Sequence, residues 1–102
     1  MIYPPVQYHD YLNLDEILNA QKLRSHEFGP EAHDEMLFII VHQTYELWFK
    51  QILFEVDSVL KTITSDKISE VDMGVVVSRL ERVTEIQKLL IDQVSVLETM
   101  TA

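Results

Sequence analysis

The chain has 102 residues, enough for one domain at most, and 47% hydrophobic and 25% charged residues are ordinary for a globular protein. Its formal charge is −9 and no lysine- and arginine-rich stripe is present, so neither nucleic acid nor an anionic membrane surface is an expected partner. The absence of cysteine excludes disulfides, thiolate metal sites and cysteine nucleophiles.

Targeting signals are also missing from the sequence. The N-terminus has no basic segment followed by an apolar stretch, which a secretory signal would need. The longest apolar runs are far shorter than the ~20 residues of a membrane-spanning helix. We therefore expect no membrane association and, by default, a cytoplasmic location.

Residues 1–12 are predicted to form an extended aromatic arm, because the Pro4-Pro5 pair disfavours a helix. This segment carries an unusual load of aromatic rings, namely Tyr3, Tyr8 and Tyr11. Terminal arms fray unless something holds them, and aromatic rings are suitable anchors. The rings either pack on helices of the same chain or contact something else, and the pattern alone leaves both open.

Residues 13–102 are predicted to be helical. Asn13 and Glu16 have the spacing of a capping box at the start of a short helix, and residues 25–30, which contain Gly29-Pro30, indicate a loop. A long helix should then run from near residue 31 to near residue 64, about 45 Å. After a polar connection at 65–72, a third helix should reach about residue 100.

The predicted fold class is therefore all-α, with an extended arm, a short helix and two long antiparallel helices. The first long helix is apolar on two opposite sides between positions 39 and 54, which is typical of a central helix covered from both sides. Two long helices and a short one do not close such a core. We expect the chain to oligomerise or to belong to a larger helical bundle.

His42 is the most informative residue, because an ionisable side chain lies within an apolar helical arc. The arc consists of Phe38, Val41, Tyr45, Trp48, Phe49, Ile52 and Val56. Phe38 and His42, four residues apart, could line a pocket for a planar apolar ligand. The alternative is a core histidine bonded to a buried carbonyl or carboxylate, and the pattern alone favours that alternative.

Metal binding and nucleophilic catalysis find little support in the sequence. Among His33, Asp34, Glu35 and His42, no histidine and carboxylate have the i, i+3 or i, i+4 spacing of a helical metal site. No Gly-x-Ser-x-Gly elbow and no glycine-rich phosphate loop is present. We therefore predict no metal ligated by this run of side chains.

The run from His33 to Ile52, His-Asp-Glu-Met-Leu-Phe-Ile-Ile-Val-His-Gln-Thr-Tyr-Glu-Leu-Trp-Phe-Lys-Gln-Ile, closely resembles the signature helix of the tryptophan 2,3-dioxygenase family. Tyr8-His9-Asp10-Tyr11-Leu12 resembles the family's N-terminal Tyr-x-x-Tyr-Leu segment. Leu18-Asn19-Ala20-Gln21 and the final Leu97-Glu98-Thr99-Met100-Thr101-Ala102 match further motifs in order. The resemblance covers essentially all 102 residues.

This resemblance implies an all-helical, homotetrameric haem b enzyme that opens the indole ring of L-tryptophan with O₂ to give N-formylkynurenine, in tryptophan catabolism. His42 is similar to the distal histidine that hydrogen-bonds the indole N–H without ligating iron. Whether it is a catalytic base or orients the ring is left open. Phe38 is similar to the aromatic residue that packs on the indole beside the haem. Tyr8 and Tyr11 resemble arm tyrosines that reach a neighbouring subunit's pocket.

Two of the family's functional elements are absent from this sequence. They are a Phe-Arg motif that holds the substrate carboxylate and, much later, the histidine that ligates the haem iron. The chain resembles about the first third of the enzyme, so we expect it to be inactive alone. The competing interpretation is a haem-free helical module for oligomerisation or interaction.

Overall fold

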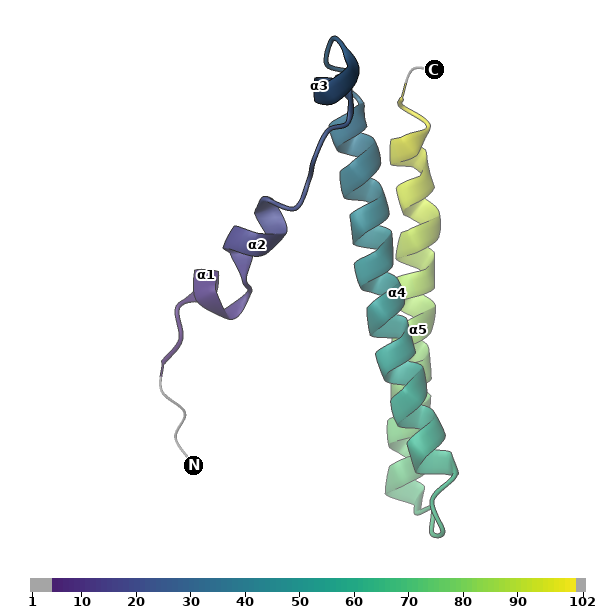
Figure 1. Cartoon of the computed structure of the whole chain (residues 1–102). Helices are drawn as coiled ribbons and strands as arrows, with labels where there is room; N and C mark the ends of the chain where they lie inside the picture. Colours follow the sequence, from purple (N-terminus) through teal and green to yellow (C-terminus); the bar gives the residue numbers. More distant parts are fainter. Residues whose placement is uncertain (1–4, 101–102) are drawn as a thin grey trace. The chain divides into compact units, whose positions relative to one another are not determined.

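The computed structural model describes residues 5–100, so the expectations for Tyr3, Pro4 and the final Thr101-Ala102 lie outside the described residues. All regular structure within this range is helical. Its elements are α1 (Tyr8–Tyr11), α2 (Leu14–Leu18), α3 (Ser25–Phe28), α4 (Glu35–Ile63) and α5 (Glu70–Leu97). The predicted all-α class with two long helices is confirmed (Figure 1). No helix among the described residues is both long and apolar enough to cross a membrane.

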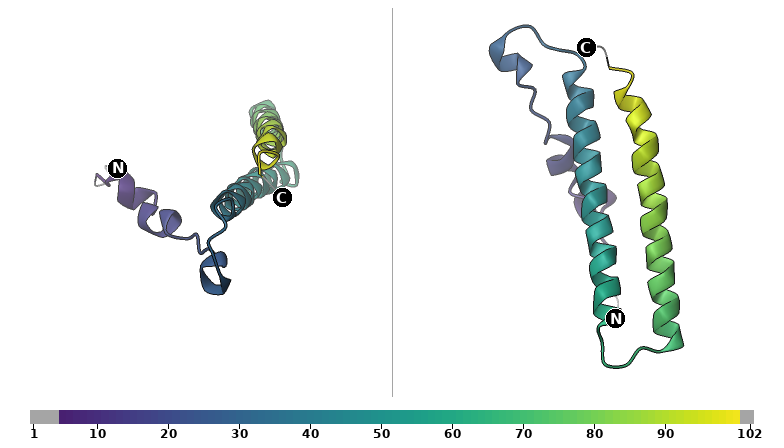
Figure 2. Two further views of the ribbon diagram at one scale, coloured as in Figure 1. Left: turned by 90° about the horizontal axis from the view of Figure 1, so that it is seen from above. Right: turned by 90° about the vertical axis from the view of Figure 1, so that its right-hand side faces the viewer.

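The chain divides into two compact units, Met1–Met36 and Leu37–Ala102, and the second unit is mostly a helical hairpin. In it α4 and α5 run side by side in opposite directions (Figure 1 and Figure 2). Their buried apolar residues recur at heptad-like spacing and form a seam: Val41 and Val59 on α4, and Val76, Val83 and Ile86 on α5. This seam is the core of the second unit.

Three polar contacts cross the seam between α4 and α5. The Tyr45 hydroxyl donates to the carbonyl of Leu90 at 2.7 Å, and Gln93 Nε2 donates to Thr44 Oγ1 at 2.8 Å. Nearer the turn, Arg82 Nη1 lies 2.9 Å from Glu55 Oε2. Glu55 is only 3% exposed, so its carboxylate is buried within an otherwise apolar seam. Gln51 Nε2 donates a further hydrogen bond to it at 3.1 Å.

The outer faces of the hairpin are largely apolar and exposed in this single chain. On α4 they carry Leu47, Leu53, Phe54 and Leu60, and on α5 they carry Val71, Val77, Leu80 and Ile91. Leu80 and Val94 on α5 continue the apolar spacing of Val76 and Val83, but each is 45% exposed, because the seam of a two-helix hairpin is narrower than the whole apolar face.

A capping box starts α5 at Glu70, three residues earlier than predicted. The Ser69 hydroxyl accepts from the amide of Asp72 and the Asp72 carboxylate accepts from the amide of Ser69, each at 3.1 Å. These bonds satisfy amides that would otherwise lack partners in the first turn of the helix. The polar connection between the long helices therefore comprises residues 64–69.

Replacing Ser69 by alanine should lower the free energy of unfolding by about 0.5–2 kcal/mol, because the cap is lost. Urea denaturation followed by circular dichroism measures this change. Ser95→Ala is the matched control, since the Ser95 hydroxyl bonds only to the carbonyl of Asp92 within α5. Equal stability of both variants would show that the cap contributes nothing.

The N-terminal segment differs from the predicted extended arm. Tyr8–Tyr11 form one helical turn, closed by hydrogen bonds from the amides of Tyr11 and Leu12 to the carbonyls of Gln7 and Tyr8 at 2.9 and 3.1 Å. The proline pair constrains only its immediate neighbours, so a turn can form three residues later. His9 Nε2 lies 2.7 Å from Asp15 Oδ1, which links α1 to α2.

The predicted capping box at Asn13 is not formed. Its side chain makes no capping hydrogen bond, and its backbone is left-handed, with φ 52°. Asparagine tolerates this region better than most residues, so Asn13 turns the chain between α1 and α2.

A short helix, α3, occupies part of the predicted loop, and Gly29 ends it with φ 153°, a conformation that L side chains rarely adopt. After it, α4 begins at Glu35, four residues later than predicted. The Glu35 carboxylate accepts from the amide of Arg24 at 2.9 Å, and from the amide and hydroxyl of Ser25 at 3.0 and 2.6 Å. The amide of Ala32 donates to the Ser25 hydroxyl, which keeps the chain before Glu35 in a loop.

Glu35 and Glu55 both have a pKa below the ordinary value of 4.5. The cause is chiefly the Ser25 hydroxyl for Glu35 and the Arg82 guanidinium for Glu55. A carboxyl with a lowered pKa in the folded state contributes stability above its unfolded pKa, and this contribution disappears as pH falls through the folded value.

We therefore expect stability to be constant near neutral pH and to fall once the pH drops below about 4.5. Urea midpoints measured from pH 7 to pH 3 test this. Glu55→Gln and Glu35→Gln should each flatten the acid limb, and an unchanged limb in both would contradict the assignment.

Candidate functional site

His42 lies near the N-terminal end of α4, and its own helix fixes its ring. Nδ1 is 2.7 Å from the carbonyl oxygen of Phe38, one turn earlier. A carbonyl only accepts hydrogen bonds, so Nδ1 must carry the proton and donate it. In the neutral imidazole, Nε2 is then an acceptor, and it has no hydrogen-bond partner within residues 5–100.

The rings of Phe38 and His42 stack against each other. Their centroids are 4.2 Å apart and their planes differ by 34°. His42 is exposed and Phe38 is 49% exposed, so the interpretation of His42 as a buried core histidine is wrong. His42 belongs to the apolar arc of the helix, but only part of that arc packs against α5. The seam with α5 passes through neighbouring Val41, and His42 lies at its edge.

An open groove of about 470 Å³ between α4 and α5 includes His42 in its wall. The wall is formed by His42, Tyr45, Glu46 and Phe49 from α4 and by Leu90, Ile91, Val94 and Leu97 from α5. Tyr45 and Phe49 stack with a centroid distance of 6.0 Å, and the Tyr45 hydroxyl is tied to Leu90 on the opposite helix. The groove is thus a largely apolar, partly aromatic surface that also carries the His42 imidazole and the Glu46 carboxylate.

Tyr45 and Glu46 line the groove but are not among the site residues predicted from the sequence. They lie three and four residues after His42, so helical spacing could have identified both. The α5 wall could not be identified in this way, because it depends on the register of the two helices. Phe38 does not line the groove itself and contacts it only through the His42 ring.

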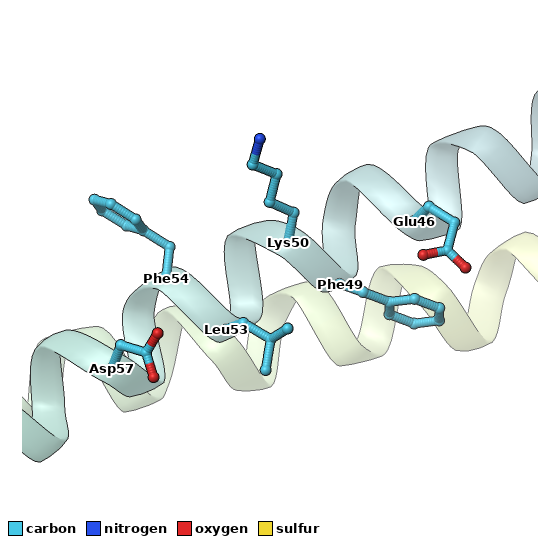
Figure 3. A pocket seen from close by; sticks show the side chains of 6 residues that line it. All are labelled: Glu46, Phe49, Lys50, Leu53, Phe54 and Asp57. Atoms are coloured by element: carbon cyan, nitrogen blue, oxygen red, sulfur yellow. The ribbon is translucent and has the colours of Figure 1, made fainter.

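A second depression lies on α4 next to the groove and shares Glu46 and Phe49 with it. Figure 3 shows Phe49 and Leu53 on one side of the helix and Lys50 and Phe54 on the other. Exposed aromatic and aliphatic side chains therefore continue beyond the groove along α4.

Tyr8 and Tyr11 lie in the first unit and are 74% and 72% exposed. Neither ring packs into a core of its own unit, and their expected role in a neighbouring subunit stays a prediction. No group of three or more histidine, cysteine, aspartate or glutamate side chains among the described residues could hold a metal ion.

Comparison with known proteins agrees with the motif. The family model described as tryptophan 2,3-dioxygenase matches residues 4–102. The tryptophan 2,3-dioxygenase of Bdellovibrio bacteriovorus is 64% identical over 101 residues, which are 99% of this chain and 28% of that protein. Proteins of the same name from Dictyostelium discoideum and Alteromonas mediterranea are 57% and 53% identical over 97 residues, 95% of this chain and 24% and 27% of their own lengths.

The chain spans about a quarter of the length of these relatives, somewhat less than the third that its motifs suggested. The match is nearly continuous across the chain and includes α4 with Phe38 and His42. This chain belongs to the tryptophan 2,3-dioxygenase family.

Proposed function

We propose that this chain supplies the distal, substrate-facing part of a haem-dependent tryptophan 2,3-dioxygenase, which opens the indole ring of L-tryptophan with O₂ to give N-formylkynurenine. The observation that carries the proposal is the hydrogen bond from His42 Nδ1 to the Phe38 carbonyl. It leaves Nε2 as an acceptor on an exposed aromatic surface, which suits the N–H of an indole.

In this proposal the two side chains have separate tasks. His42 Nε2 accepts the indole N–H hydrogen bond and sets the orientation of the ring, or takes its proton. Phe38, already stacked on His42, packs against the flat face of the indole. The short Nδ1 contact holds the imidazole in one orientation before substrate arrives, which reduces the ordering needed on binding.

Haem b is the cofactor that the family implies. Phe38 and His42 fit the distal side of the haem. They offer a flat aromatic surface for the indole ring and an acceptor nitrogen for its N–H. The haem, when bound, supplies the activation of O₂ at its iron. Phe38 and His42 would then hold the indole and exclude water on that side, while the iron ligand comes from elsewhere.

Subunit contacts belong to the same proposal. Exposed Tyr8 and Tyr11, and the apolar outer faces of α4 and α5, are surfaces that a homotetramer would cover. In that arrangement the two tyrosines reach the pocket of a neighbouring copy.

The 102-residue chain alone should form no N-formylkynurenine from L-tryptophan with haem and ascorbate, because it spans about a quarter of its relatives. Absorbance of the product during incubation measures this. Product above a haem-only control would contradict the expectation.

The exposed apolar faces also favour a second candidate, a haem-free helical interaction module. A haem titration of the chain distinguishes the two. A Soret band that shifts when His42 is replaced by alanine supports the distal-pocket proposal, whereas haem uptake indistinguishable from nonspecific binding in both proteins supports the module.

A further inference from the structure

Glu55 is the one charged residue in the buried part of the α4–α5 seam within residues 5–100. It lies on α4, away from His42, with Val59 one turn further along the same seam. A carboxylate in such a place costs free energy unless it is paired, and replacing buried ion pairs by apolar residues often leaves stability unchanged or higher. Arg82 is 59% exposed, so only the carboxylate half of the pair is buried, and stability alone does not account for Glu55 at this position.

The contacts of Glu55 depend on one alignment of the two helices. Arg82 Nη1 approaches it at 2.9 Å from α5, while Gln51 Nε2 donates at 3.1 Å from its own helix. The other side-chain pair across the seam is Thr44 with Gln93. Thr44 and Glu55 are eleven residues apart (44 to 55), and their partners Gln93 and Arg82 are also eleven residues apart (93 to 82), so both pairs define the same antiparallel register.

Apolar burial alone does not select this register. The seam repeats apolar residues at heptad-like spacing on both helices, so sliding one helix by a heptad again places apolar residues together. After such a slide, Glu55 would face apolar residues of α5, near Ile86 and Leu90 in one direction and near Val76 in the other. A buried carboxylate without its guanidinium is strongly disfavoured there.

We propose that Glu55, with Arg82, is a positioning residue that fixes the register of α4 against α5. This register places Leu90, Val94 and Leu97 opposite His42 and so builds the groove. A slide of seven residues would move the α5 wall by about 10 Å. This role of Glu55 involves neither haem nor tryptophan and is independent of the proposed function.

Disulfide trapping tests the inference directly, because the chain has no cysteine of its own. The pair T44C/Q93C reports the observed register. S58C/I86C and T44C/I86C, whose residues all lie within α4 and α5, report slides of one heptad in either direction. In the observed register, each of the latter pairs is displaced by about 10 Å along the helix, too far for a disulfide. Intramolecular disulfide is measured in dilute protein as the oxidised monomer band.

With Glu55 present, T44C/Q93C should form nearly all of the disulfide. In the E55L background, the slipped pairs should rise roughly tenfold while the helix content and the urea midpoint stay equal or increase. E55Q, which keeps the shape and lacks the charge, should show a smaller rise. E85Q is the matched control, since Glu85 pairs with Lys88 within α5 and does not cross the seam.

Two results would overturn the inference. In the first, the E55L and E55Q proteins fold and still form disulfide only through T44C/Q93C. The register would then be set by the turn at 64–69 and the Ser69 cap. The second is failure of both variants to form the helical hairpin, which would make Glu55 a stabilising residue instead.

Discussion

Replacing His42 by phenylalanine should lower kcat/KM for L-tryptophan by about 10²-fold or more, because the acceptor for the indole N–H is lost while an aromatic ring remains next to Phe38. The measurement uses a chimera in which residues 1–102 replace the matching 28% of the Bdellovibrio bacteriovorus relative. The initial rate of N-formylkynurenine formation gives kcat and KM separately.

His33→Phe in the same chimera is the matched control, because His33 is exposed and lies outside the groove. It should leave kcat/KM unchanged. If the His42 and His33 variants have equal rates and equal haem content, the Nε2 acceptor takes no part in the reaction, and the assignment of the site is wrong.

Replacing Arg82 by methionine should destabilise the α4–α5 hairpin more than any other single change discussed for the fold, because it leaves the buried Glu55 carboxylate without its main partner. It should also reverse the pH dependence. In the native protein the pKa of Glu55 lies below 4.5, so acid removes stability. Without Arg82, burial is the largest remaining influence on the pKa of that carboxyl and raises it, against the smaller lowering effects of Gln51 and Arg79. We therefore expect its protonation in acid to restore stability.

Urea midpoints of the Arg82→Met protein at pH 7 and near pH 5 test this reversal. Lys88→Met, which breaks the exposed pair with Glu85, should change neither the midpoint nor its pH dependence. An Arg82→Met hairpin that is as stable as the native one at pH 7, or that still loses stability in acid, would show that Arg79 or water compensates Glu55.

Much of the fold could be predicted from the sequence, because the two long helices have continuous helical periodicity and few glycines or prolines. Predictions failed where specific polar contacts decide the local structure. The later start of α4 depends on three hydrogen bonds from residues 24 and 25 to Glu35, which no periodicity encodes. The left-handed backbone at Asn13 similarly replaced the expected capping box.

In the candidate site, too, some features could be predicted from the sequence and others could not. The i, i+4 spacing of Phe38 and His42 placed both rings together, and the structure agrees. The sequence could not show that His42 lies at the edge of the seam, because α4 is apolar on two opposite sides and only the position of α5 distinguishes them. Glu55 could not be recognised as buried for the same reason, since its partner Arg82 is 27 residues away.

N-formylkynurenine formation by the chimera tests whether this chain provides the distal part of a tryptophan dioxygenase pocket. The folded, haem-loaded chimera should convert L-tryptophan to N-formylkynurenine, and the His42→Phe version should lose most of that activity. A folded, haem-loaded chimera that forms no product from L-tryptophan would contradict the claim.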